Sequence, residues 1–260
     1  MEENMRKFRV MMMRAAAASS AVLAFALLPA VALSADAPKV TASTAWTGAF
    51  AEAAGADVDV LAGYELRHPP EYDFSPRDIQ RAVEADFIVW GGYEGFVADL
   101  VEAARIPDER VVGVRTNNTP PLMREAVRAL AERFGTMDAY EAFAAELDAK
   151  AQALLEAAEG AGVGSVRVAV NGHYEPLLEW LGYDIVAVFG PGEVTTGTIA
   201  EVERQEPDLI VDNWHVPLGE PLDTGERGYV QLINFPGHDG TRDLIDVLDY
   251  YARTLGLGAP

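Results

Sequence analysis

The chain alternates short runs of β-branched and other apolar residues with helical stretches, and one long helical region interrupts this alternation near its middle. Short apolar runs predict buried strands, and the intervening helices supply the crossovers that parallel strands need. The fold class is therefore α/β, with two small lobes of mainly parallel sheet. The expected strands are 40–44, 57–61, 87–90 and 111–114 in the first half, and 166–170, 185–189, 208–211 and 229–233 in the second.

The interruption at residues 121–158 carries apolar side chains at helical spacing and, in its second part, lacks helix breakers for over 20 residues. This pattern predicts one long helix with a single buried stripe at Tyr140, Phe143, Leu147, Ala151 and Leu154. The helix would join the lobes, with a ligand cleft between them. The expected segments are a signal peptide at 1–35, an N-terminal lobe at 36–119, a helical linker at 120–160 and a C-terminal lobe at 161–260.

Shorter helices are expected near 46–54, 76–85, 93–105 and 242–255. The start of the second is well defined, because Ser75 is a good N-cap, Pro76 suits the first helical position and Asp78 can complete a capping box. His68 lies in the loop that leads into this helix, after which two prolines follow directly. The loop is therefore expected to hold the imidazole in a preset place.

The first 35 residues have the pattern of a cleaved export signal. Four basic residues precede the apolar run 15–33, and small residues follow it. A membrane anchor is the alternative, since the run approaches the ~20 residues that span a bilayer, but Pro29 interrupts it. The chain has no cysteine, which excludes a lipid-anchored lipoprotein and disulfides. We expect the mature protein to be free in the periplasm.

The charge of the chain is strongly negative, with 41 acidic against 20 basic residues and a net charge of −21. Such a field disfavours nucleic acid and anionic membrane surfaces as partners. A cation is the ligand that the charge permits, although solubility alone explains most of the acidic residues.

All four histidines follow predicted strands, at the edge where ligands bind in open α/β sheets. Neutral imidazole is the commonest side-chain metal ligand, and carboxylate or amide oxygens complete sites for zinc or manganese. The polar residues at this edge are His68, Glu94, Asn117, Asn118, Asn171, His173, Asp212, Asn213, His215, Asn234 and His238.

Motifs for other chemistry are missing from the sequence: it has no nucleophile elbow, Walker A loop, dinucleotide fingerprint or HExxH. Three tryptophans near strand ends, Trp46, Trp90 and Trp214, are able to stack on a flat ligand or simply to pack.

Three segments carry a resemblance to a known family. They are HPPEYDFSPRDIQRAVEADFIVWGGYEGFVADL at 68–100, NGHYEPLLEWLGYDIVAVFGP at 171–191, and the long central helix. In their order, these segments resemble the TroA-like solute-binding proteins of ABC importers, which capture zinc, manganese or iron in the bacterial periplasm. The resemblance covers about residues 40–257.

The resemblance implies four metal ligands, two from each lobe. His68 matches the first and His173 the third. The second is usually a histidine, where this chain has Asn117 or Asn118, and the fourth is usually an acid, where it has Asn234.

These departures leave two alternatives. In a rebuilt site, His215 and Asp212 would join His68 and His173, giving the three histidines and one oxygen of a tetrahedral zinc site. Otherwise the ligand is a metal chelate, or a metal held with an extra small ligand.

The expected function is that of a binding protein, not an enzyme, which captures a divalent metal ion as its transported ligand. Zinc is placed ahead of manganese or iron. The expected partner is the membrane permease of an ABC importer, and the protein is expected to be a monomer. A receptor for a chelate such as a cobalamin or siderophore is the first alternative. An exported metal-dependent hydrolase, with Glu94 or Asp212 as general base, is the second.

Overall fold

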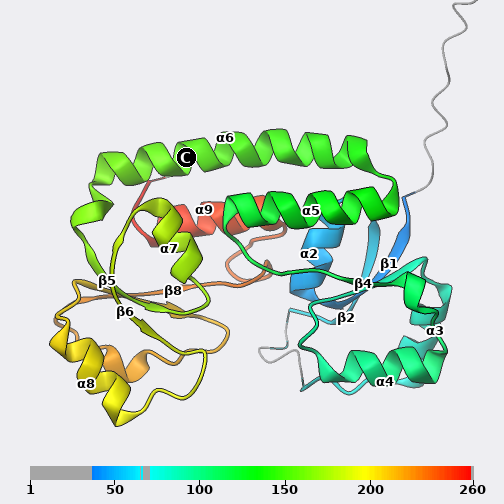
Figure 1. Ribbon diagram of the computed structural model, residues 1–260, viewed down its shortest axis with the longest axis horizontal. Coiled ribbons are helices and arrows are strands. Elements are labelled where there is room, and N and C mark those ends of the chain that lie inside the picture. The colour runs from blue at the N-terminus through cyan, green and yellow to red at the C-terminus, as the bar shows by residue number, and fades with distance from the viewer. Residues whose placement is uncertain (1–36, 65, 67–70, 259–260) are drawn as a thin grey trace, which may run out of the picture. The chain divides into compact units, whose positions relative to one another are not determined.

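The computed structural model describes residues 37–64, 66 and 71–258, and it contains two four-stranded sheets with parallel pairing throughout. The strand orders are β2-β1-β3-β4 and β6-β5-β7-β8. These sheets confirm the α/β class and its two lobes (Figure 1). The strands are β1 (Lys39–Thr44), β2 (Asp57–Ala62), β3 (Phe87–Trp90), β4 (Val111–Gly113), β5 (Arg167–Asn171), β6 (Asp184–Phe189), β7 (Leu209–Asn213) and β8 (Gly228–Leu232).

Each sheet has a topological switch point, because its first strand in sequence lies between the next two. β1 lies between β2 and β3, and β5 lies between β6 and β7. The chain therefore leaves the central strand toward one side and returns on the other, which opens a crevice outside the carboxyl ends of the strands. The start of α2, directly after Thr44, and the turn after Asn171 are placed at these two crevices.

The helices begin and end where local sequence signals favour it. α3 starts at Pro76 with a capping box, in which the Ser75 N–H donates to Asp78 Oδ2 at 2.8 Å, as predicted. The helices are α2 (Ala45–Ala53), α3 (Pro76–Glu84), α4 (Gly95–Ala104), α5 (Pro120–Phe134), α6 (Met137–Ala161), α7 (Glu175–Leu181), α8 (Thr196–Arg204) and α9 (Leu244–Thr254).

The long helix α6 has 25 residues and ends at Gly162, whose φ of +67° is accessible to glycine at little cost. Its buried face includes Tyr140, Leu147 and Leu154, as predicted from their spacing. Ala144 is also buried on this face, whereas the predicted Phe143 and Ala151 are half-buried, and Phe143 packs against the core.

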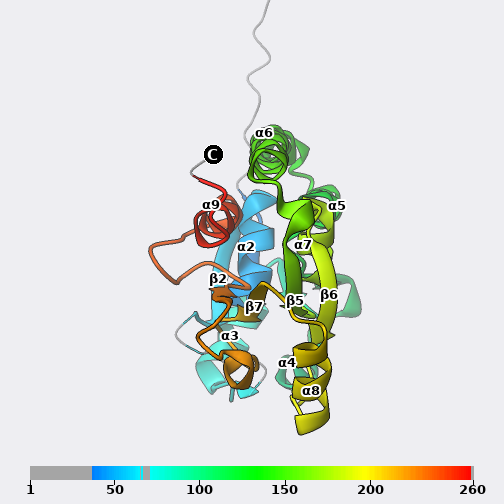
Figure 2. The same cartoon turned by 90° about the vertical axis from the view of Figure 1, so that its left-hand side faces the viewer.

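One hydrophobic core connects the two sheets through the helices around α6. α5 and α9 both contact α6 and lie beside it in both views (Figure 1 and Figure 2). The core cluster includes Val40 and Val89 from the first sheet and Val168 and Val211 from the second. The lobes are thus tied together away from the strand ends, which leaves the loops at those ends to form a site.

The described residues contain no helix that is both long and apolar enough to cross a membrane. The signal peptide expected at 1–35 lies outside the described residues. The expected segment boundaries near 119 and 160 stay predictions, although β1–β4 precede α5 and β5–β8 follow α6.

Candidate metal-binding site

A small pocket forms where loops from both lobes meet beyond the strand ends. The volume open to the centre of a water-sized sphere is about 10 Å³. This is roughly the volume that a cavity needs in order to hold one water molecule. The pocket is thus of a size for a single ion or water rather than an organic molecule. It is lined by Trp46, Asn117, Asn118, Thr119, His173, Tyr174, Leu177 and Asn234.

This one pocket is therefore lined by residues at three of the four ligand positions that the resemblance implies, namely Asn117 or Asn118, His173 and Asn234. They come from the loops after β4, β5 and β8, and Trp46 joins them from the first turn of α2. The fourth implied ligand position is that of His68, which lies outside the described residues. The sequence analysis placed a site at the strand ends, and the described residues form a pocket there.

His173 is the histidine of this pocket, and its ring is anchored from one side. Asn171 Oδ1 lies 3.0 Å from His173 Nδ1 and also accepts the His173 backbone N–H at 3.2 Å. The side chain reaches solvent, but burial of part of the ring disfavours its charged form and lowers the pKa of His173. Neutral imidazole, the form that binds metals, is therefore favoured at neutral pH.

Thr119 contributes an oxygen that sequence analysis missed. Its hydroxyl Oγ1 is buried and, in the part of the chain that the structure describes, no hydrogen-bond partner reaches it. A buried hydroxyl without a partner is costly, and an ion or water in the pocket would relieve that cost. The available signal was its place between a strand end and the Pro120–Pro121 helix start, since strand-end loops carry ligand contacts.

Asn118 is committed to contacts between the lobes. Its Nδ2 donates to Asn234 O at 2.5 Å and to Tyr251 Oη at 2.7 Å, and its Oδ1 accepts from Trp46 Nε1 at 3.0 Å. Both ends of this amide are therefore in use, so Asn118 stabilises the walls of the pocket.

The other two asparagines have local partners as well. Asn117 Oδ1 accepts the Thr119 backbone N–H at 2.8 Å, and Asn234 Oδ1 accepts the Tyr174 hydroxyl at 2.8 Å. A carbonyl oxygen has two lone pairs, so each of these oxygens keeps the capacity to contact an ion.

His215 is buried beside the pocket without lining it. Its Nδ1 accepts the backbone N–H of Asn234 at 3.2 Å, and its ring lies 3.8 Å from that of Phe235. A neutral imidazole whose Nδ1 accepts a hydrogen bond carries its proton on Nε2, which leaves no lone pair for a metal. This contact argues for a structural role, and the role of His215 as a ligand stays a prediction.

Asp212 is fully buried and surrounded by donors. Its Oδ1 accepts from Asn171 Nδ2 at 3.1 Å and from the Leu218 N–H at 3.3 Å. Its Oδ2 accepts from the Gly219 N–H and the Tyr229 hydroxyl, both at 2.8 Å. These four hydrogen bonds engage both carboxylate oxygens, and two of them fix the backbone of the loop at Leu218 and Gly219. The role of Asp212 as a metal ligand therefore also stays a prediction.

His238 stacks on Trp214 at 4.0 Å between ring centroids, and its ring also meets Tyr250 edge-on. Among the described residues, no three His, Asp or Glu side chains are grouped as a metal would require. The site of three histidines and one oxygen includes His68 and is not tested by the described part of the chain.

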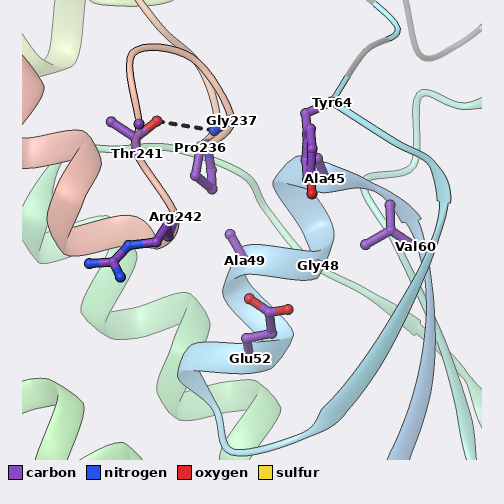
Figure 3. Close-up of a pocket in the computed structure, with 11 residues that line it drawn as sticks. Ala45, Gly48, Ala49, Glu52, Val60, Tyr64, Pro236, Gly237, Thr241 and Arg242 are labelled. Atoms are coloured by element: carbon purple, nitrogen blue, oxygen red, sulfur yellow. Dashed lines mark hydrogen bonds between the residues drawn. The ribbon is translucent and has the colours of Figure 1, made fainter.

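A second, larger pocket of about 370 Å³ lies along one face of α2, opposite the loop 236–242 (Figure 3). Ala45, Ala49 and Glu52 form this face of the helix, and Pro236 and Arg242 lie across from it. Glu52 is an exposed residue, but partial burial of its carboxyl and the nearby negative charge of Asp243 both raise the pKa of Glu52. The ionised Glu52 side chain is thus disfavoured in the folded protein.

We expect the Glu52→Gln variant to melt slightly higher than the wild type at about pH 7. An acid with a raised pKa in the folded state lowers stability once ionised, and this penalty vanishes when both states are protonated. The gain in melting temperature of Glu52→Gln over the wild type should therefore disappear at about pH 3, below the usual range of Glu pKa values. Melting curves at both pH values, with the exposed Glu125→Gln as control, measure this. An equal gain in melting temperature at both pH values would contradict the raised pKa of Glu52.

The two lobes, their parallel sheets and the long helix between them define the fold of the TroA-like metal-binding solute-binding proteins. The periplasmic zinc-binding protein TroA from Treponema pallidum superposes with a TM-score of 0.64 at 14% identity, over 86% of this chain and 99% of that one. The solute-binding protein FpvC from Pseudomonas aeruginosa, solved with Mn²⁺, gives 0.62 at 18% identity, over 85% and 100%.

A manganese-bound periplasmic metal-binding protein from Candidatus Liberibacter asiaticus gives a TM-score of 0.62 at 13% identity, over 85% of this chain and 100% of that one. Neither a protein-family model nor a curated protein sequence matches the chain. The resemblance found in the sequence is thus confirmed at the level of the fold.

Proposed function

We propose that the protein is a periplasmic solute-binding protein that captures a divalent metal ion and delivers it to the permease of an ABC importer. It acts as a monomeric binding protein and carries out no chemical reaction on its ligand. Zinc is the ion that we place first, with manganese or iron as alternatives. The export signal predicted at 1–35 and the net charge of −21 support this assignment, because a negative field raises the local concentration of cations.

The observation that carries the proposal is the convergence of His173, Thr119 and Asn234 from both lobes on a pocket of ionic size. An imidazole nitrogen and neutral oxygens suit zinc and related transition metals. His68 is the natural further ligand by its place in the sequence. The contacts of His215 and Asp212 favour positioning roles, and His215 enters the test as a separate variant.

We expect zinc to raise the melting temperature of chelator-stripped protein, and the His173→Ala variant to lose this response. A ligand that binds only the folded state adds RT ln(1 + [L]/Kd), about 2.7 kcal/mol at 100 times Kd. The measurement is thermal unfolding with zinc, manganese, iron and cobalt added separately. His68→Ala is expected to behave like His173→Ala.

His238→Ala is the matched control, because it removes a loop histidine that does not line the pocket. This variant should keep the full metal response. His215→Ala tests the rebuilt site: loss of the response in a variant that is still folded would restore His215 as a ligand candidate. A wild-type protein that no metal stabilises would contradict the proposal.

A receptor for a metal chelate is the alternative function that the larger pocket favours. Its volume of about 370 Å³ lies in the range of small-molecule sites, roughly 300–1,000 Å³, whereas the small pocket has room only for an ion. Metal chelates are usually coloured, so the absorbance spectrum of protein purified from its native source separates the two functions.

A further inference from the structure

Four side chains form a continuous hydrogen-bonded chain that ends on the imidazole of His173. The Tyr229 hydroxyl donates to Asp212 Oδ2 at 2.8 Å, and Asp212 Oδ1 accepts from Asn171 Nδ2 at 3.1 Å. Asn171 Oδ1 then lies 3.0 Å from His173 Nδ1. Asp212 and Asn171 are fully buried, so solvent does not compete for the contact between them, and the contacts at the two ends of the chain are partly buried.

The carboxylate of Asp212 sets the orientation of the Asn171 amide. An ionised carboxylate only accepts hydrogen bonds, so the amide must turn its NH₂ group toward Asp212. The carbonyl Oδ1 of Asn171 then faces His173, where it also accepts the backbone N–H at 3.2 Å. A flipped amide would set an oxygen against Asp212 and an NH₂ group against the backbone N–H of His173.

The orientation of the amide in turn determines the tautomer of His173. Because Asn171 presents an acceptor, Nδ1 of the neutral ring has to carry the proton and donate it. The lone pair of the imidazole is then on Nε2, the nitrogen that does not contact Asn171. Residue 173 is also the one histidine of the described chain that lines the small pocket.

We propose that Asn171 and Asp212 are positioning residues that hold His173 as its Nδ1–H tautomer, so that Nε2 serves as the metal-binding atom. This inference rests on the proposed function for its metal, but not for the tautomer itself. It gives Asp212 a role that acts through Asn171 instead of direct coordination. Partners of this kind that orient a ligating histidine typically change metal affinity about 10–100-fold when they are removed.

The test reads the tautomer and the affinity separately. The ¹⁵N shifts of the His173 ring in the metal-free protein report which nitrogen is protonated, and titration with Zn²⁺ alone gives the Kd. We expect the Nδ1–H pattern in the wild type. Asn171→Ala should abolish that pattern and weaken zinc binding about 10–100-fold. Asp212→Asn should give mixed tautomers and a smaller loss, because the amide of residue 171 is then free to flip.

Two controls separate positioning from a general loss of stability. Ile210→Val trims the buried core on the same strand as Asp212 and should melt lower without changing the tautomer. Asp184→Asn removes an exposed carboxylate at the start of β6, in the same lobe, and should change neither readout.

A wild-type ring protonated on Nε2 would overturn the inference, and so would unchanged tautomers in Asn171→Ala and Asp212→Asn. If the wild type shows the Nδ1–H pattern, and both variants lose it, while none of zinc, manganese and iron binds, the positioning role stands and the proposed function is wrong. If zinc binds with the tautomer unaffected by either variant, the function stands and the positioning role is wrong.

Discussion

The Asn118→Ala variant is expected to lose about 2–3 kcal/mol of unfolding free energy. Asn118 is buried, and its amide connects Trp46 of α2 with Asn234 and Tyr251 of the C-terminal lobe through three hydrogen bonds. Truncation leaves the Trp46 N–H and the Asn234 carbonyl without this partner in an interior where water replaces it poorly. Urea denaturation at equilibrium measures the change.

Asn117→Ala is the matched control for this variant. Asn117 is the half-buried neighbour, and its side-chain oxygen accepts one local bond from Thr119, so its loss should cost about 1 kcal/mol or less. A double-mutant cycle between Asn118→Ala and Tyr251→Phe should reveal coupling of about 0.5–3 kcal/mol, the range for directly bonded residues. Equal effects of Asn117→Ala and Asn118→Ala would contradict the role of Asn118 as a contact between lobes.

The secondary structure was predictable because its signals are local. Each expected strand matches an observed one within about two residues, since a run such as FIVW at 87–90 is apolar and is bounded by Asp86 on one side and by two glycines on the other. The start of α3 at Pro76 was predictable for the same reason, as its capping residues adjoin it. The α7 and α8 helices received no residue ranges: α7 has only seven residues, and the glycine and β-branched residues of α8 (TGTIAEVER) have low helix propensity.

The location of the site was also predictable, because parallel strands bring their following loops to one edge. The roles of its residues were not. Residue type marks Asp212 and His215 as potential ligands, but only the fold shows that Gly219, Tyr229 and Asn234 donate to them. Such contacts join positions that no local pattern relates, as for Asn118 and Tyr251, which are 133 residues apart.

The Glu94→Ala variant is expected to lose about 3–4 kcal/mol of unfolding free energy. Glu94 has no exposed surface, and its carboxylate accepts from the Ser43 hydroxyl at 2.6 Å and from the backbone N–H groups of Gly91 and Tyr93. It is the N-cap residue of α4, where the helix dipole favours negative charge. Removing it leaves three buried or partly buried donors without their acceptor.

The contacts of Glu94 also separate its structural role from the role of general base that the hydrolase alternative assigns to it. Both of its oxygens are engaged within the N-terminal lobe, and its side chain does not line the small pocket. Glu94→Gln should therefore lower stability by a smaller amount, because an NH₂ group then faces backbone donors, while the zinc Kd stays within about threefold of the wild type. The exposed Asp99→Ala on α4 serves as control for urea denaturation. A zinc affinity that falls in step with stability in Glu94→Gln would place this carboxylate in the binding site and contradict its assignment to the turn between β3 and α4.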